Sequence, residues 1–212
     1  MAQTIHLAHM PPELALYVSL YTDVENAPFL KQQLLAGNAE FEYAFIDASM
    51  ILSTTHVLAA AFRAMNDYLN DRLKSHNIHS EIVFSLSPNN NIGEAFRRFG
   101  ISDSTRNLLV VKVSTTPQVT QATVAQHLST HVKGKEIPFD DVTLRGLSDV
   151  ERIRKVYKIS LPPPHSSSGK NHKGGRDDVV TNGDKVTILD STTFSSNLER
   201  QVLGLMALRG AT

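Results

Sequence analysis

Apolar residues follow two alternating spacings along this chain, and the alternation predicts strands interleaved with helices. Runs rich in aliphatic and aromatic residues predict strands over 14–21, 41–46, 81–86, 108–113 and 186–189. Apolar residues three or four positions apart, together with capping residues, predict helices that begin at Asn26, Ser53, Asn91 and Ser148, and two more over 124–132 and 197–208. This order of elements predicts an α/β fold.

The first two predicted helices carry apolar residues on one face each. In the helix from Asn26, which Gly37 should end, the residues expected to face inward are Phe29, Leu30 and Leu34. In the long helix from Ser53 the inward residues expected are Leu58, Ala61, Phe62, Met65 and Leu69.

The segment 91–101 is informative because both ends of a short helix can be read in it. Asn91 can cap this helix with its side-chain oxygen, and Glu94 occupies the capping-box position three residues later. Gly100 is expected to end the helix in the left-handed conformation. A strand over 108–113 should follow.

The same helix carries an apolar stripe with basic residues beside it. Its members stand at positions i, i+3, i+4 and i+7, and they are Ile92, Ala95, Phe96 and Phe99. On pattern alone, such a stripe most simply faces the core of its own fold.

Three blocks of sequence together resemble one protein family. The first is the pattern Asn-Ile-x-x-Ala-Phe-x-x-Phe-Gly-Ile that begins at Asn91, the second is Ser-x-x-His from Ser53 at the start of an alanine-rich helix, and the third is Ala-Leu-Arg-Gly from Ala207. In order and spacing these blocks resemble the kinase-binding small subunit of the KEOPS (EKC) complex, in its fungal form. The resemblance extends over the whole chain except 162–185.

The resemblance implies a binding role without catalysis. In that family the partner is the small atypical kinase-like ATPase of KEOPS, whose N-lobe is contacted by the helix at 91–99 and by the C-terminal helix. Ile92, Phe96 and Arg97 are then expected contacts, while Ala95 and Phe99 stay inside. The complex makes the threonylcarbamoyl (t6A) modification on adenosine 37 of tRNA. The threonylcarbamoyl transfer itself is carried out by a different subunit. The complex is also linked to telomere maintenance, and relatives of this subunit hold the tRNA 3′ end.

The C-terminal helix points to a partner independently of the resemblance. From Val202 to Leu208 every residue is apolar or glycine, so about two turns lack a polar face at ~3.6 residues per turn. One face can pack on the sheet, and the other, with Val202, Leu205 and Met206 as candidates, would need cover from another chain. The alternative is a terminal helix enclosed wholly by its own fold.

Composition limits the remaining possibilities. The 212 residues suit a single domain spanning 1–212, with a flexible insertion at 162–185 that is poor in large apolar residues. Lys plus Arg equal Asp plus Glu at 21 each, so no overall field would attract nucleic acid. The absence of cysteine excludes disulfides, thiolate nucleophiles and cysteine-based zinc sites. With neither signal peptide nor membrane-spanning run, we expect a protein of the nucleus and cytoplasm without membrane contact.

Candidate chemistry is sparse. His56, near a helix N-terminus, is interpreted as a hydrogen-bonded structural histidine. His127 and His131 have the spacing of two metal ligands but lack a third, so neither a metal site nor any other cofactor is predicted. No catalytic motif is found either.

A basic cluster follows Ser148, which is expected to cap a helix with Val150, Ile153 and Tyr157 inward. Its outer face could meet RNA phosphates through Arg152, Arg154, Lys155 and Lys158.

We therefore predict an α/β (α+β) protein with a mainly antiparallel sheet covered by helices. Its partners would be the kinase-like subunit, tRNA and, indirectly, the threonylcarbamoyl transferase subunit. The alternatives are an autonomous RNA-binding protein and a metal hydrolase with histidine ligands.

Overall fold

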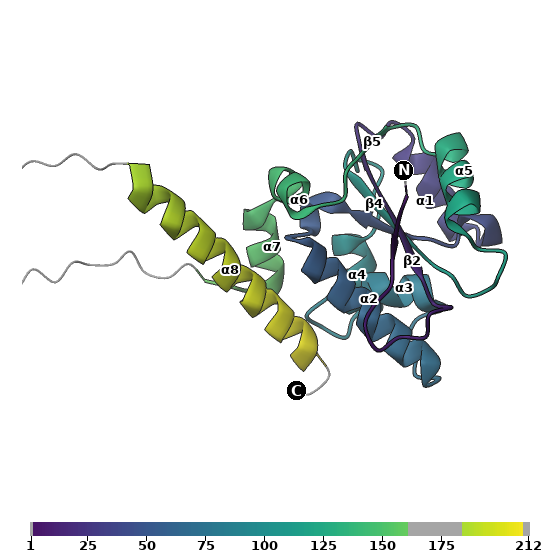
Figure 1. The fold of residues 1–212 in the computed structure, drawn as a ribbon, viewed down its shortest axis with the longest axis horizontal. Coiled ribbons are helices and arrows are strands. Elements are labelled where there is room, and N and C mark those ends of the chain that lie inside the picture. The colour runs from purple at the N-terminus through teal and green to yellow at the C-terminus, as the bar shows by residue number, and fades with distance from the viewer. Residues whose placement is uncertain (1, 161–183, 210–212) are drawn as a thin grey trace, which may run out of the picture.

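The computed structural model describes residues 2–160 and 184–209, and an antiparallel sheet lies at their centre (Figure 1). Its strands are β1 (Gln3–Ile5), β2 (Leu16–Thr22), β3 (Ala44–Asp47), β4 (Leu108–Val113) and β5 (Lys135–Ile137). The order is β1-β2-β4-β3, and β5 pairs with the end of β2 that β1 leaves free. Every pairing is antiparallel, which confirms the predicted sheet type.

Alternate residues of the strands face two separate cores, as the pleat of a strand requires. Leu16, Val18 and Leu20 of β2 belong to one core, whereas Tyr21 belongs to the other. The residues of β4 divide in the same way, with Leu109, Val111 and Val113 in the first core and Leu108 and Val110 in the second. Helices must therefore cover both faces of the sheet.

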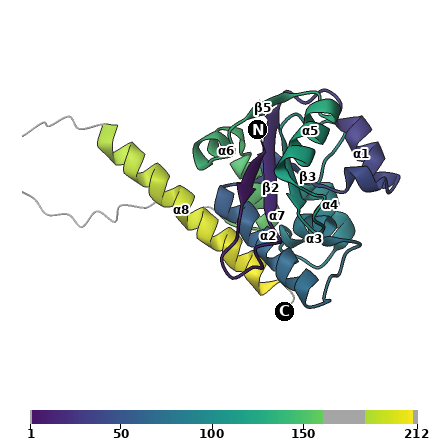
Figure 2. The same ribbon diagram turned by 45° about the vertical axis from the view of Figure 1, so that its right-hand side comes forward.

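Helices do cover both faces, and Figure 2 shows the sheet between the two groups. The second core lies under α1 (Ala27–Leu35) and α5 (Gln121–His131). The first and larger core contains residues of α2 (Thr54–Leu69), α3 (Ile78–Ser85), α4 (Ile92–Phe99), α6 (Asp141–Leu147), α7 (Val150–Tyr157) and α8 (Asp184–Leu208). Two short 3-10 helices, η1 (Ala39–Phe41) and η2 (Ala48–Met50), flank β3.

Two predicted strands are wrong. The run 81–86 is part of helix α3, and 186–189 lies within α8. The error at α3 has a physical reason, because this helix is buried on nearly every side and even the polar residues of the run, Glu81 and Ser85, are buried. A short continuous apolar run does not distinguish a buried strand from a buried helix.

The predicted inward faces of α1 and α2 are correct only in part. Leu30 of α1 is buried, but Phe29 is exposed and touches Phe41 edge to face at a ring distance of 5.8 Å. In α2 the buried residues are His56, Val57, Ala60, Ala61, Ala64 and Met65, whereas the large side chains of Phe62 and Leu69 are exposed. The small residues let α2 pack closely against α3, so the inward face is rotated from the predicted one. Most of the segment 162–185, predicted to be a flexible insertion, lies outside the described residues.

Candidate functional site

Helix α4 begins as its sequence predicts, but its capping box is not closed. The Asn91 side chain accepts a hydrogen bond from the Glu94 backbone N–H at 2.9 Å. The Glu94 carboxylate does not return this bond to Asn91. It accepts instead from Asn89 at 3.1 Å and forms an ion pair with Arg98.

Gly100 ends α4 for a different reason from the predicted one. Its φ of −74° and ψ of 170° are extended, not left-handed. A Cβ at this position would lie 2.6 Å from the carbonyl oxygen of Phe96. The helix end therefore requires glycine because the backbone passes too close for a side chain.

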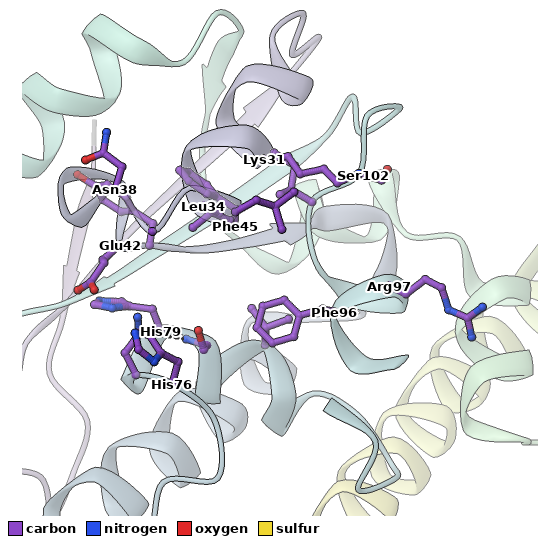
Figure 3. A pocket seen from close by; sticks show the side chains of 17 residues that line it. Lys31, Leu34, Asn38, Glu42, Phe45, His76, His79, Phe96, Arg97 and Ser102 are labelled. Carbon is purple, nitrogen blue, oxygen red and sulfur yellow. Dashed lines mark hydrogen bonds between the residues drawn. The ribbon is translucent and has the colours of Figure 1, made fainter. Parts of the chain in front are cut away.

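The apolar stripe of α4 divides between the core and the surface. Ala95 and Phe99 are buried, while Ile92 is 37% exposed. Phe96 is half-buried and lines a pocket beside α3. Arg97 is exposed and its guanidinium points away from that pocket (Figure 3). The division at Ala95 and Phe99 is as the resemblance implied.

In α8, the predicted outward residues are partly wrong. Val202 and Met206 are fully buried in the first core, so they cannot contact another chain. Leu205 is half-buried, and Leu208, which the sequence did not single out, is 60% exposed. A run without a polar face carries no signal for which side turns inward, and only packing decides it.

Two arginines hold the last turn of α8 in place. Arg63 of α2 donates to the carbonyl oxygen of Met206 at 2.6 Å and to that of Arg209 at 3.0 Å. The Arg209 guanidinium lies 3.9 Å from the Phe84 ring centroid and donates to the Phe84 carbonyl oxygen at the end of α3. Burial and, to a smaller extent, nearby Arg63 lower the pKa of Arg209 to about 10. The position of α8 is therefore fixed by specific contacts.

A groove runs along the outward side of α8. Its volume is ≈ 650 Å³. Its walls are mainly apolar and come from α8, the end of α7 and the turn before α4, with Leu205, Leu208, Gly204, Val156, Ile159 and Pro88 among them. Because Pro88 lies in the turn that leads into α4, the groove extends from α8 to the segment just before that helix.

His56 connects α2 and α7 inside the protein. Its Nδ1 accepts from the Leu52 backbone N–H at 3.3 Å, and its Nε2 lies 2.9 Å from the hydroxyl oxygen of Tyr157. The Tyr157 hydroxyl in turn donates to the carbonyl oxygen of Leu86. Burial lowers the pKa of His56 to about 3. The interpretation of His56 as a hydrogen-bonded structural residue is confirmed.

The neighbouring residues of the same block attach other helices to α2. Ser53 caps α2 by accepting from the His56 backbone N–H at 3.1 Å, and its hydroxyl donates to Glu199 of α8. Thr54 donates from its backbone N–H and from its hydroxyl to Asp141 of α6, both at 2.8 Å. The Ser-x-x-His pattern therefore has a structural role at a helix junction.

The basic cluster of α7 is smaller than predicted. Asp149, not Ser148, caps the helix by accepting from the Arg152 N–H at 3.0 Å. Arg154 is buried and paired with Glu151 at 3.1 Å, so its predicted availability for phosphate is wrong. Arg152 forms an ion pair with Asp47 at 3.1 Å. Only Lys155 and Lys158 of the four are exposed without an ion pair among the described residues.

The two histidines of α5 contribute to an aromatic cluster. The rings of His127 and His131 lie 4.3 Å apart and pack against Phe41, and Nδ1 of His127 lies 3.0 Å from the Tyr43 hydroxyl. Across residues 2–160 and 184–209, no three His, Asp or Glu side chains gather where they could hold a metal ion. Of the helices in this part of the chain, none combines the length and apolar character needed to cross a bilayer.

Comparison with known proteins supplies the family. The family described as "Kinase binding protein CGI-121" matches residues 21–210. The chain belongs to this family. A curated relative from Aspergillus terreus, named EKC/KEOPS complex subunit cgi121, is 56% identical over 99% of this chain and 97% of its own length. Relatives of the same name from Aspergillus fumigatus and Schizosaccharomyces pombe are 52% and 34% identical, over 99% and 70% of this chain and 97% and 84% of their own lengths. The resemblance read from the sequence is confirmed.

Proposed function

We propose that this chain is a non-catalytic subunit of a KEOPS (EKC) complex and binds the small atypical kinase-like ATPase of that complex. Membership of the CGI-121 kinase binding family supports the kinase partner, and similarity to KEOPS subunits over nearly the full length supports the complex. The single structural observation that carries the proposal is the apolar groove along α8.

The groove has the features of a docking surface. Leu208 is 60% exposed and Leu205 is half-buried, although both stand on a helix whose other side is anchored in the core. Exposed apolar groups gain free energy when a partner covers them, at roughly 25 cal/mol per Å². Ile92 of α4 adds a further exposed apolar residue beyond Pro88. An apolar side chain of the kinase N-lobe would fill the groove, and Ile92 and Arg97 of α4, which lie outside its lining, would add further contacts.

The proposed role in tRNA modification follows from the complex. By holding the kinase-like subunit, the chain would support threonylcarbamoyl transfer to adenosine 37, while the transfer itself belongs to another subunit. Lys155 and Lys158 at the end of α7 would contribute to tRNA binding, because their ammonium groups can approach phosphate. The proposal includes the link of such complexes to telomere maintenance.

Titration calorimetry with the purified kinase subunit tests the docking surface. Leu205→Glu and Leu208→Glu would each place a charge in an apolar interface and should weaken binding on the order of a hundredfold. Val142→Glu is the matched control, because Val142 is 79% exposed on α6 and should leave affinity unchanged. If both groove variants fold and bind like the control, the groove is not the docking surface.

A further inference from the structure

The last two turns of α8 carry no polar residue that marks an outward side. One turn earlier, the exposed Gln201 stands beside the buried Val202, so the polar pattern itself selects the inward side there. From Val202 to Leu208 this contrast is lost, because every residue is apolar or glycine. The apolar part of the groove nevertheless lies in these turns, since Leu205 and Leu208 both belong to its lining.

Burial of apolar area does not decide which side of these turns faces the core. Each residue turns a helix by about 100°, so a local twist by one residue would exchange Met206 for Leu205 in the core. Leucine and methionine replace one another readily in cores. The same twist would exchange the buried Arg209 for Leu208, which carries no charge into the interior. Since the hydrophobic effect is non-directional, the observed orientation must have another cause.

Directional contacts of two arginines supply that cause. α8 runs beside α2 (Figure 2), and Arg63 of α2 donates to the carbonyl oxygens of Met206 at 2.6 Å and Arg209 at 3.0 Å. Arg209 in turn donates to the carbonyl oxygen of Phe84 and lies over its ring, at the end of α3. The end of α8 is therefore held by α2 and by α3. Hydrogen bonds need a defined direction, so a twist by one residue would break these contacts.

Arg209 is an unfavourable residue to bury for stability alone. Its side chain is almost fully buried, and its Nε–H has no hydrogen-bond partner within residues 2–160 and 184–209. Within the same ranges its guanidinium is held by a ring and by neutral oxygen atoms, and no carboxylate forms an ion pair with it. A buried charge without a carboxylate partner costs free energy, whereas its directional bonds can specify one arrangement of a helix.

We infer that Arg63 and Arg209 are positioning residues for the α8 groove, which turn Leu205 and Leu208 toward the kinase without contacting it. Neither arginine belongs to the lining of the groove. The inference rests on the proposed function for the identity of the partner. The orientation of α8 can be measured without the partner, so the two claims are tested separately.

Thiol labelling measures the orientation in the full chain alone. The sequence contains no cysteine, so one introduced cysteine gives a single signal. Leu208→Cys reports the exposed side of the last turns, and Met206→Cys reports the buried side. With both arginines intact, the exposed thiol should react with a maleimide on the order of a hundredfold faster than the buried one. In Arg63→Met and in Arg209→Met, this ratio should fall toward one.

Titration calorimetry with the kinase subunit measures the consequence for binding. Arg63→Met and Arg209→Met keep an unbranched side chain and should weaken kinase binding roughly tenfold. Thermal unfolding of each variant shows that it is folded at the assay temperature, so that the loss does not report unfolded chain. Arg200→Met is the matched control. Arg200 is an exposed arginine of α8 that donates to Ser196 and Asn197 of its own helix, and its loss should change neither the labelling ratio nor the affinity.

Each combination of results decides the inference. It is overturned if the folded methionine variants keep the affinity of the intact chain, or if they lose affinity while the labelling ratio stays unchanged. Where Arg209→Met does not fold, Arg209→Lys takes its place, because lysine keeps the charge but not the planar group over Phe84. If Leu205→Glu and Leu208→Glu bind the kinase like the intact chain, the proposed docking surface itself fails, and a changed labelling ratio would then show orientation without a role in binding.

Discussion

The buried connection between His56 and Tyr157 gives the sharpest prediction about stability. In Tyr157→Phe the ring stays and only the hydroxyl is lost. Two buried groups then lose their partner, the Nε2–H of His56 and the carbonyl oxygen of Leu86. Each unsatisfied group costs roughly 1–3 kcal/mol, so the free energy of unfolding should fall by about 2–6 kcal/mol.

The same histidine makes stability depend on pH in a defined direction. The pKa of His56 is about 3 in the folded protein, whereas an unfolded histidine titrates near ~6.5. Between these values the unfolded chain binds a proton that the folded chain does not, so stability rises with pH and is complete above pH ~6.5. His79 has the same low pKa of about 3. Each histidine should therefore cost roughly 2 kcal/mol of stability when the pH falls from ~6.5 to ~5.

Urea unfolding followed by circular dichroism at several pH values measures both effects. Tyr68→Phe is the control for the tyrosine change, because Tyr68 is exposed and its hydroxyl should contribute little. The reasoning would be refuted if Tyr157→Phe were as stable as Tyr68→Phe. It would also be refuted if the intact chain kept its full stability at pH ~5, because both buried histidines would then accept protons without cost.

Other predictions concern packing, backbone and charge. Met206→Ala should lower the free energy of unfolding by about 2–4 kcal/mol in thermal or urea denaturation, since the side chain is buried; a loss under ~0.5 kcal/mol would contradict that burial. Gly100→Ala should destabilise the protein, because the new Cβ would lie 2.6 Å from a carbonyl oxygen. Gly93→Ala should stabilise the protein by up to ~1 kcal/mol in the same assay, since that position is open and helical. Equal effects of the two substitutions would show that the close approach at Gly100 does not matter. Removing Lys155 and Lys158 should reduce the salt slope of tRNA affinity by up to ~0.7 to 0.9 per charge in filter binding, and an unchanged slope would exclude these lysines.

Local sequence signals were sufficient to predict a helix whose capping residues lie within the same short segment. Asn91 caps α4 as predicted because the cap needs only residues three apart. Strand β4 was also predicted correctly, because its aliphatic run from Leu108 to Val113 matches the observed strand. By contrast, β1 and β5 were missed because each has three residues and exists only through pairing with β2.

The outward surface of α8 could be predicted only in part from the sequence, because long-range contacts decide which residues are exposed. The absence of a polar face from Val202 to Leu208 shows that both sides of α8 are apolar, but the burial of Met206 and the exposure of Leu208 depend on how Arg63 and Arg209 fix the helix. His79 gave no signal at all. Its Nε2 accepts from the backbone N–H of Val113, and its Nδ1 has no hydrogen-bond partner among the described residues. Both facts depend on a contact between residues far apart in the chain, which the spacing of residues in the sequence does not show.

Hydrogen exchange of the chain with and without the kinase subunit tests the central claim most directly. Binding along the groove should slow amide exchange in the last turns of α8, at the end of α7 and in the first turn of α4. Exchange in α5, on the opposite face of the sheet, should stay unchanged. Protection confined to α1 and α5, with α8 unaffected, would contradict the account.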